Sequence, residues 1–447
     1  MNAIRKIRVE DVIAFSAIAM IAFHLYWQYW FVDLMGVWVV NPLLPIAILG
    51  ILALIYIRST GSWPEFDVAL PATWAFLGLY LLFASASSLV NETDFRQVVN
   101  WLVYAWSPAA VFLTIHGLKN LRDDDQINRC VKFLFLVMVL LSIYGLYALN
   151  FQKYPILKPI LYWGEHGVVF ETRGSDPLRY SLPGMSSTHY APMLLPLILL
   201  GVHWAQESER VAKYVFLAAT GFLAYCLFGT IARAAIIPLL VGLAYLTWVR
   251  CIPRWSGALV GCSVIGLCFL HPAIAMRLTA LTPALDYPER QMLAHIVRDP
   301  ESAAQIVGST PTTQGHLVIA AHTLGIAARR PILGVGMGRL GDLQNSTLAE
   351  YGGKSHNNFL SIAAGFGFPA LLFYSLFLIS LAVYLNRAIG RMPDSEPRRL
   401  GQTWLAILIS YGLYLNGEPA EFHFVWLWLA LIAVWIRNHK DAHASVV

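Results

Sequence analysis

Residues 130–149, CVKFLFLVMVLLSIYGLYAL, decide the fold class. Lys132 is the only charged residue in this stretch. As an α-helix rising about 1.5 Å per residue, the stretch would be roughly 30 Å long, which is the thickness of the hydrocarbon core of a bilayer. The stretch therefore predicts a helix that crosses a membrane.

Similar apolar stretches recur along the whole chain. Hydrophobic residues make up 57% of the 447 residues and charged residues only 13%, too few to cover the surface of a soluble protein. A membrane β-barrel would need alternating polar residues, which these stretches lack. We expect an all-α polytopic membrane protein with about 12 transmembrane helices, at 12–32, 37–57, 68–90, 99–117, 130–149, 189–205, 213–230, 234–249, 256–271, 368–386, 402–416 and 421–437.

The basic residues predict the orientation of these helices. If the N-terminus is cytoplasmic, the cytoplasmic segments hold 18 of the 31 lysines and arginines, and the short outer connections hold only Arg96 and Arg233. Both termini are then cytoplasmic. A second hydrophobic run follows the first at once, so we expect no cleaved signal peptide. The positive-inside bias accounts for most of the net charge of +5, and no nucleic-acid partner is needed.

Two outer segments are too long for simple turns. The first is 150–188, within a first membrane section at 1–271, and the second is a large loop at 272–355, before a last membrane section at 356–447. The large loop has amphipathic stretches at about 285–307 and 315–330. We expect it to fold as helices over the outer face of a single membrane domain.

Several classes of protein are disfavoured by the residues present. The five cysteines show no CxxC spacing and lie outside the outer loops, so neither a disulfide framework nor a metal site is expected. No Asp or Glu lies near the middle of a predicted span, which argues against an ion-coupled transporter. We expect no cofactor.

Two residues stand out as candidates for chemistry at the outer surface. Arg233, in FGTIARAAIIP, joins two apolar runs almost without a polar spacer. It is either an interfacial anchor or a clamp for an anion such as a diphosphate. His356, in SHNNFL, is either a surface residue beside a helix cap at Ser355 or Asn357, or a general base at the membrane surface.

Two other motifs favour a structural interpretation. The segment PILGVGMG at 331–338 resembles a nucleotide-binding loop, but no strand precedes it and it lies on the outer side. We interpret it as a glycine-rich tight turn. The acidic residues Asp123, Asp124 and Asp125 are interpreted as a solvated cytoplasmic loop rather than a metal site.

These features together resemble the O-antigen ligase/polymerase superfamily. The resemblance rests on the arginine in FGTIARAA, the large outer loop leading through RRPILGVGMG, and HNNFLSIAAGFGFPALLF, over roughly residues 213–385. It implies a membrane glycosyltransferase of the GT-C type that uses a polyprenyl-diphosphate-linked glycan.

The resemblance also implies roles for individual residues. His356 falls on the family's essential histidine, and Arg233 on its arginine after the short outer hairpin. The family usually has a further arginine about fifteen residues before the PxxGxG proline, with an aromatic residue four positions later. Here these positions hold His316 and Ala320. Either His316 takes that role, or it passes to other arginines; the candidates are Arg290 and Arg298, and more weakly Arg173 and Arg179.

Within the superfamily, length, span number and the late position of the loop favour an O-antigen ligase. Such an enzyme would join an undecaprenyl-diphosphate-linked O-antigen to lipid A-core, without metal, at the periplasmic face of a Gram-negative inner membrane. An O-antigen polymerase and a protein O-oligosaccharyltransferase are the alternatives with the same donor. A lipid-linked glycan flippase is the alternative from another class, but it should place charged residues along the spans.

Overall fold

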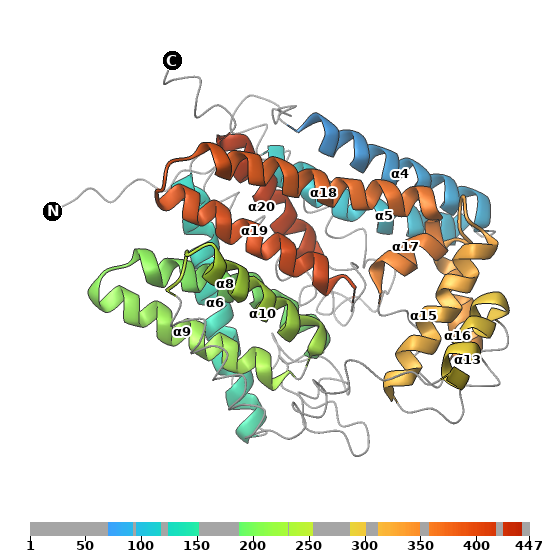
Figure 1. Cartoon of the computed structure of the whole chain (residues 1–447), viewed down its shortest axis with the longest axis horizontal. Helices are drawn as coiled ribbons and strands as arrows, with labels where there is room; N and C mark the ends of the chain where they lie inside the picture. Colours follow the sequence, from blue (N-terminus) through green and yellow to red (C-terminus); the bar gives the residue numbers. More distant parts are fainter. Residues whose placement is uncertain are drawn as a thin grey trace.

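A computed structural model gives the fold of the chain (Figure 1). It describes residues 70–92, 95–117, 124–151, 187–230, 232–253, 287–300, 312–348, 357–416 and 423–439. All regular elements in these ranges are helices, which confirms the predicted all-α class. The helices are α4 (Pro71–Asn91), α5 (Phe95–Gly117), α6 (Asp124–Phe151), α8 (Ser187–Glu207), α9 (Arg210–Gly229), α10 (Arg233–Trp248), α13 (Tyr287–Arg298), α15 (Thr312–Arg329), α16 (Met337–Leu348), α17 (Asn358–Phe366), α18 (Phe368–Arg391), α19 (Glu396–Tyr414) and α20 (His423–His439).

Length and composition support a multi-pass membrane protein. Within the described ranges, four helical segments are long and apolar enough to cross a bilayer: Pro71–Asn91, Asp124–Leu146, Arg210–Gly229 and Phe368–Arg391. Three further apolar segments are shorter: Ala234–Trp248, Leu317–Arg329 and Val425–His439. The predicted spans at 12–32, 37–57 and 256–271 lie outside the described residues, so the number of twelve stays a prediction.

Within the bundle, a side chain of one helix supplies a hydrogen bond that prolines remove from another helix. Pro192 and Pro196 both lie inside α8, and Pro196 has no N–H to donate to the carbonyl of Pro192. The hydroxyl of Tyr411, from α19, donates to that carbonyl at 3.1 Å. Because an unpaired carbonyl is costly in hydrocarbon, this bond lets α8 keep both prolines in the bundle interior.

Small residues let neighbouring helices approach closely. A Cβ atom at Gly242 of α10 would lie 2.6 Å from the hydroxyl of Ser410 in α19. A Cβ atom at Gly401 of α19 would lie 2.5 Å from the indole of Trp435 in α20. Glycines at such positions are typical of packed membrane helices, where close contact replaces the hydrophobic effect between helices.

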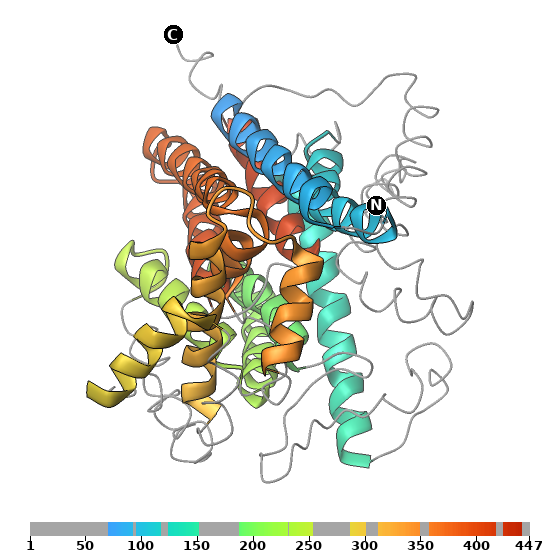
Figure 2. The same ribbon diagram turned by 90° about the vertical axis from the view of Figure 1, so that its right-hand side faces the viewer.

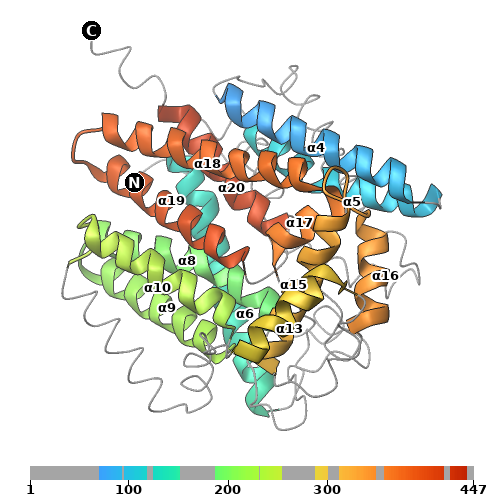
Figure 3. The same ribbon diagram turned by 45° about the vertical axis from the view of Figure 1, so that its right-hand side comes forward.

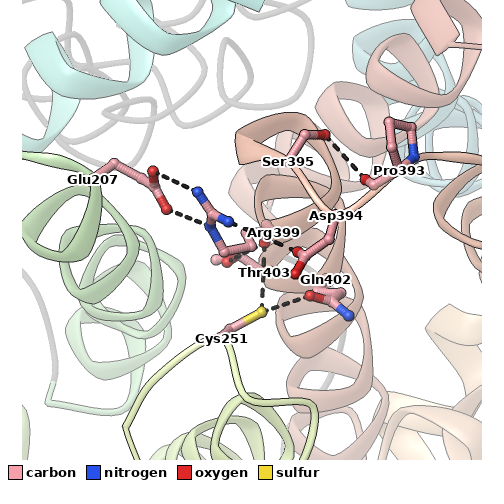
Figure 4. A network of polar contacts seen from close by, with 8 residues as sticks. All are labelled: Glu207, Cys251, Pro393, Asp394, Ser395, Arg399, Gln402 and Thr403. Carbon is pink, nitrogen blue, oxygen red and sulfur yellow. Dashed lines mark hydrogen bonds and ion pairs between the residues drawn. The ribbon is translucent and has the colours of Figure 1, made fainter.

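One end of the bundle carries a polar network that joins α8, α10 and α19 (Figure 4). Arg399 donates to both carboxylate oxygens of Glu207, from Nε at 2.6 Å and from Nη2 at 3.0 Å. The thiol of Cys251 donates to the side-chain oxygen of Gln402 at 2.7 Å. Arg210 begins α9 and Arg250 follows α10 at this same end, which is the end that the sequence predicts to be cytoplasmic.

The opposite end of the bundle carries α13, α15 and α16, which derive from the predicted large loop. Figure 1 shows these three helices at the lower right, below the right-hand ends of α4, α5 and α18. Figure 2 looks onto this side and shows them in front of the bundle. Both stretches of the loop predicted to be amphipathic therefore contain helix, at Tyr287–Arg298 and Thr312–Arg329.

The Glu207–Arg399 pair predicts a pH dependence of stability. Hydrogen bonding from Arg399 holds the pKa of Glu207 below its usual value of about 4.3, although burial opposes this shift. The pair therefore stabilises the fold fully above about pH 5, and its contribution disappears as the pH falls through the lowered pKa. We expect Glu207→Gln to cost on the order of 1 kcal/mol at pH 7, measured by thermal unfolding in detergent.

The matched control is Asp394→Asn. Asp394 lies 3.8 Å from the same guanidinium, but its side chain is 86% exposed, so little change is expected. A loss in Glu207→Gln that persisted undiminished below pH 3 would contradict the assignment.

Candidate active site

The position of Arg233 follows from the packing of α10 against α19. Ser410 of α19 donates to the carbonyl of Pro238 in α10 at 2.8 Å, and Cys251 contacts Gln402 farther along the pair. The two helices therefore run antiparallel. Five residues before Pro238 is Arg233, the first residue of α10, and five residues after Ser410 is Leu415. Arg233 and Leu415 are therefore level with each other.

The beginning of α17 meets α19 at this same residue. The amide of Asn358 donates to the carbonyl of Leu415 at 2.9 Å. Asn357 caps the helix, since its side-chain oxygen accepts from the amide of Leu360 at 3.0 Å. The cap predicted at Ser355 or Asn357 is thus made by Asn357. Figures 1 and 3 show the start of α17 near the ends of α10 and α19.

His356 immediately precedes Asn357 in the sequence and lies outside the described residues. The structure nevertheless brings the backbone of Arg233 and the residue next to His356 to one end of α19. Their roles in chemistry stay predictions.

The segment 331–336 is a tight turn that holds the C-terminal end of α17. The amides of Val335 and Gly336 donate to the carbonyls of Ala364 and Gly365, both at 2.9 Å. These carbonyls belong to the last turn of a helix, where the helix itself supplies no partners. The amides of the turn are used within the protein, as expected for a structural turn rather than a nucleotide-binding loop.

The glycines of the PxxGxG motif are required by this pairing. Gly334 and Gly336 have φ values of 62° and 84°, which glycine adopts without strain. A Cβ atom at Gly334 would lie 2.5 Å from the carbonyl oxygen of Ala364. Gly367, between α17 and α18, has a φ value of 95°, and its Cβ would lie 2.1 Å from the carbonyl oxygen of Ile332.

Three polar residues at the end of α4 complete this arrangement. Ser87 donates to the carbonyl of Gly365 at 2.8 Å, and Asn91 donates to the carbonyl of Leu333 at 3.3 Å. A carboxylate oxygen of Glu92 accepts from the amide of Gly338 at 2.9 Å. None of the three was predicted from the sequence; the available signal was a cluster of polar residues, SSLVNE, at the end of an apolar run.

An aromatic layer lies against α17. The ring of Tyr374 in α18 lies 6.0 Å from Phe359, 5.4 Å from Tyr80 and 6.1 Å from Trp426, centroid to centroid. Tyr374 is 1% exposed, so the contacts are fully buried. Rings at these separations pack favourably and support the short helix from the bundle side.

The other candidate residues of the large loop are distributed over α13 and α15. His316 lies in the second turn of α15 and Arg290 in the first turn of α13, both placed by their backbones. Arg298 ends α13 and is exposed; its carbonyl accepts from Arg329, the last residue of α15. A Cβ atom at Gly325 would lie 2.6 Å from the carbonyl oxygen of Val297, so the end of α13 lies beside Gly325, roughly 14 Å along α15 from His316.

Arg298 and His316 therefore lie at different heights along α15. Arg173 and Arg179, in the first long loop, lie outside the described residues. The structure leaves the second diphosphate-binding residue as a prediction.

A second histidine of α15 is placed differently. His322 is 2% exposed, and burial, together with the nearby charge of Arg329, lowers its pKa to about 4. It is therefore neutral at physiological pH. Elsewhere in the described part of the chain, no group of three His, Cys, Asp or Glu side chains could hold a metal ion.

The fold and this arrangement define a multi-pass helical membrane protein whose loop helices meet the spans at one end. The family model described as O-antigen ligase matches residues 218–375, about a third of the chain. The matched range includes Arg233, the glycine-rich turn and α17. It supports the O-antigen ligase/polymerase superfamily and a role in glycan assembly at a membrane. A comparison with curated proteins gave no match.

The junction between α17 and α18 provides a direct test of this geometry. Gly367→Ala places a Cβ against the carbonyl of Ile332 and imposes a left-handed backbone on alanine. We expect it to destabilise the protein by about 2–4 kcal/mol, measured by thermal unfolding in detergent.

Gly390→Ala is the matched control, since a Cβ at this helical position meets nothing within 4 Å. We expect it to be neutral or stabilising by up to roughly 1 kcal/mol. Equal stability of the two variants would contradict the close contact between α17 and the turn.

Proposed function

We propose that this protein is an O-antigen ligase. It transfers a glycan from undecaprenyl diphosphate to a sugar hydroxyl of lipid A-core at the periplasmic face. The observation that carries the proposal is that Arg233 is level with Leu415, the residue to which the start of α17 is bonded. Arg233 and α17 both lie in the range that matches the family model described as O-antigen ligase.

The proposed reaction is a single displacement at the anomeric carbon. The acceptor oxygen bonds to that carbon as the bond to the diphosphate oxygen breaks, which inverts the anomeric configuration. The hydroxyl proton passes to His356, and undecaprenyl diphosphate leaves with the bonding electrons. Histidine suits the role of base because its usual pKa lies near neutral pH.

Arg233 is proposed to bind the diphosphate. A guanidinium is always charged and offers forked donors that match phosphate oxygens. As the first residue of α10, it is carried by a helix that packs along α19, and this fixes its backbone. Fixed charges stabilise a developing anion without reorganisation, so the reaction needs no metal. His316 is the first candidate for the second diphosphate contact, and Arg290, Arg298, Arg173 and Arg179 are its alternatives.

The orientation in the membrane is part of the proposal. The polar end around Glu207 and Arg399 would face the cytoplasm with both termini, in agreement with the positive-inside rule. The end with α13, α15 and α16 would face the periplasm. The undecaprenyl chain would then lie among the spans of a GT-C-like enzyme in the inner membrane, with its diphosphate at the level of Arg233.

Replacing the proposed base tests the mechanism. We expect His356→Ala to lower turnover by about 10²–10⁴-fold, as is usual for the loss of a general base. The assay uses purified protein in nanodiscs, lipid-linked O-antigen and lipid A-core, with EDTA present throughout because the reaction is proposed to be metal-free.

His295→Ala is the matched control, since His295 is an exposed histidine on α13 of the same loop. It should retain wild-type turnover. Near-normal transfer by His356→Ala would refute the base. Failure of the wild type in EDTA with recovery in Mg²⁺ would refute the metal-free reaction.

The glycolipids of a deletion strain distinguish the acceptors. Loss of a ligase should leave core lipopolysaccharide without attached polymer, while long lipid-linked chains accumulate. Loss of the long lipid-linked chains themselves would instead indicate a polymerase, and unchanged lipopolysaccharide with unglycosylated proteins would indicate a protein O-oligosaccharyltransferase. Electrophoresis shows whether polymer is attached to lipopolysaccharide, and mass spectrometry shows whether long lipid-linked chains accumulate or are lost.

A further inference from the structure

Glu92 follows the last residue of α4 and is 8% exposed. Among the side chains whose burial the structure describes, no other acidic one is buried. Burying a carboxylate is costly unless hydrogen bonds and positive charge compensate. The contacts of the Glu92 carboxylate therefore indicate its role.

The carboxylate of Glu92 caps a helix that is distant in sequence. Its Oε1 atom accepts from the amide of Gly338, in the first turn of α16, at 2.9 Å. The first amides of a helix have no partners within the helix, and the helix dipole makes this end positive. A carboxylate is therefore especially favourable at the N-terminal end of α16, because it accepts a hydrogen bond and carries negative charge.

The neighbouring glycines show how closely the carboxylate approaches the chain. A Cβ atom at Gly336 would lie 2.7 Å from Oε1 of Glu92. A Cβ atom at Gly338 would lie 2.8 Å from its Oε2 atom and 2.5 Å from the indole nitrogen of Trp101 in α5. The two glycines of the GMG sequence thus leave room for Glu92 as well as for the turn.

Together with its neighbours, Glu92 fixes three segments to the end of α4. Asn91 holds the turn at Leu333, Ser87 holds the end of α17 at Gly365, and Glu92 holds the start of α16. The other end of α17 is bonded to Leu415 of α19. These contacts fix the position of α17, whose start follows His356 in the sequence, on the same helix, α19, along which α10 carries Arg233.

We propose that Glu92 is a positioning residue for glycan transfer. It locks the loop helices onto α4 so that the base at 356 and Arg233 are held in reacting geometry. This inference rests on the proposed function. Because Glu92 acts through backbone contacts, its removal should reduce the turnover number and leave the donor KM almost unchanged.

The test compares variants of the full-length protein in nanodiscs. Glu92→Ala removes the acceptor for the Gly338 amide, and Glu92→Gln keeps an oxygen acceptor without the charge. Ser88→Ala is the matched control, because the Ser88 hydroxyl donates to Ala84 within α4 itself. Glycan transfer gives kcat and KM, and amide hydrogen exchange of peptides covering 333–348 and 358–366 follows the lock without any substrate.

We expect Glu92→Ala to lower kcat about tenfold to a hundredfold, with the donor KM within about twofold, and to raise exchange over 333–348. Glu92→Gln should recover most of the turnover, and Ser88→Ala should match the wild type. If Glu92→Ala folds poorly, Gly338→Ala is measured in its place. It pushes a Cβ into the Glu92 carboxylate from the other side, so we expect the same lower kcat and faster exchange.

Three results would overturn the proposal: unchanged exchange in Glu92→Ala, wild-type kcat despite faster exchange, or Glu92→Gln as inactive as Glu92→Ala. Failure of the wild type to transfer glycan would refute the proposed function instead. The exchange measurement would still decide whether Glu92 holds α16.

Discussion

The pairing of the turn at 331–336 with the end of α17 is the contact on which the rest of the arrangement depends. α17 is only nine residues long, so a large share of its backbone groups lie at its ends. Buried ends must find partners, and the amides of Val335 and Gly336 supply them for Ala364 and Gly365. Because the partners are backbone groups, the turn has to approach α17 without intervening side chains. This requirement places glycine at 334 and 367.

From this contact the geometry extends to the whole bundle. α17 is fixed at one end by the turn and at the other by Leu415 of α19, while α10 runs along α19 and brings Arg233 to the same level. α4 holds the turn and α16 through side chains. The large loop is therefore attached to α4 directly and to α19 through α17, and it is through these attachments that a loop residue and a span residue can form one site.

Much of the fold could be predicted from local patterns, because hydropathy and capping act within a few residues. The run at 68–90 became α4 (Pro71–Asn91), and the Asn357 cap followed from its sequence position. The predicted span at 368–386 begins at the first residue of α18, but the separate helix α17 before it was not predicted, because nine residues are too few to appear as a span. Glu92 was missed because its contact joins residues 246 positions apart. Arg233 was found from its place between apolar runs, but its level with Leu415 depends on how α10 packs on α19.

The central claim is that residues 233 and 356 flank one site. Cross-linking in native membranes tests it most directly, using an R233C/H356C variant in which the five native cysteines are replaced. We predict rapid cross-linking by a short bifunctional thiol reagent. The R250C/H356C pair should remain unlinked, because Arg250 lies beyond the other end of α10, about 25 Å away. Cross-linking of the 250/356 pair, or none at 233/356, would contradict the account.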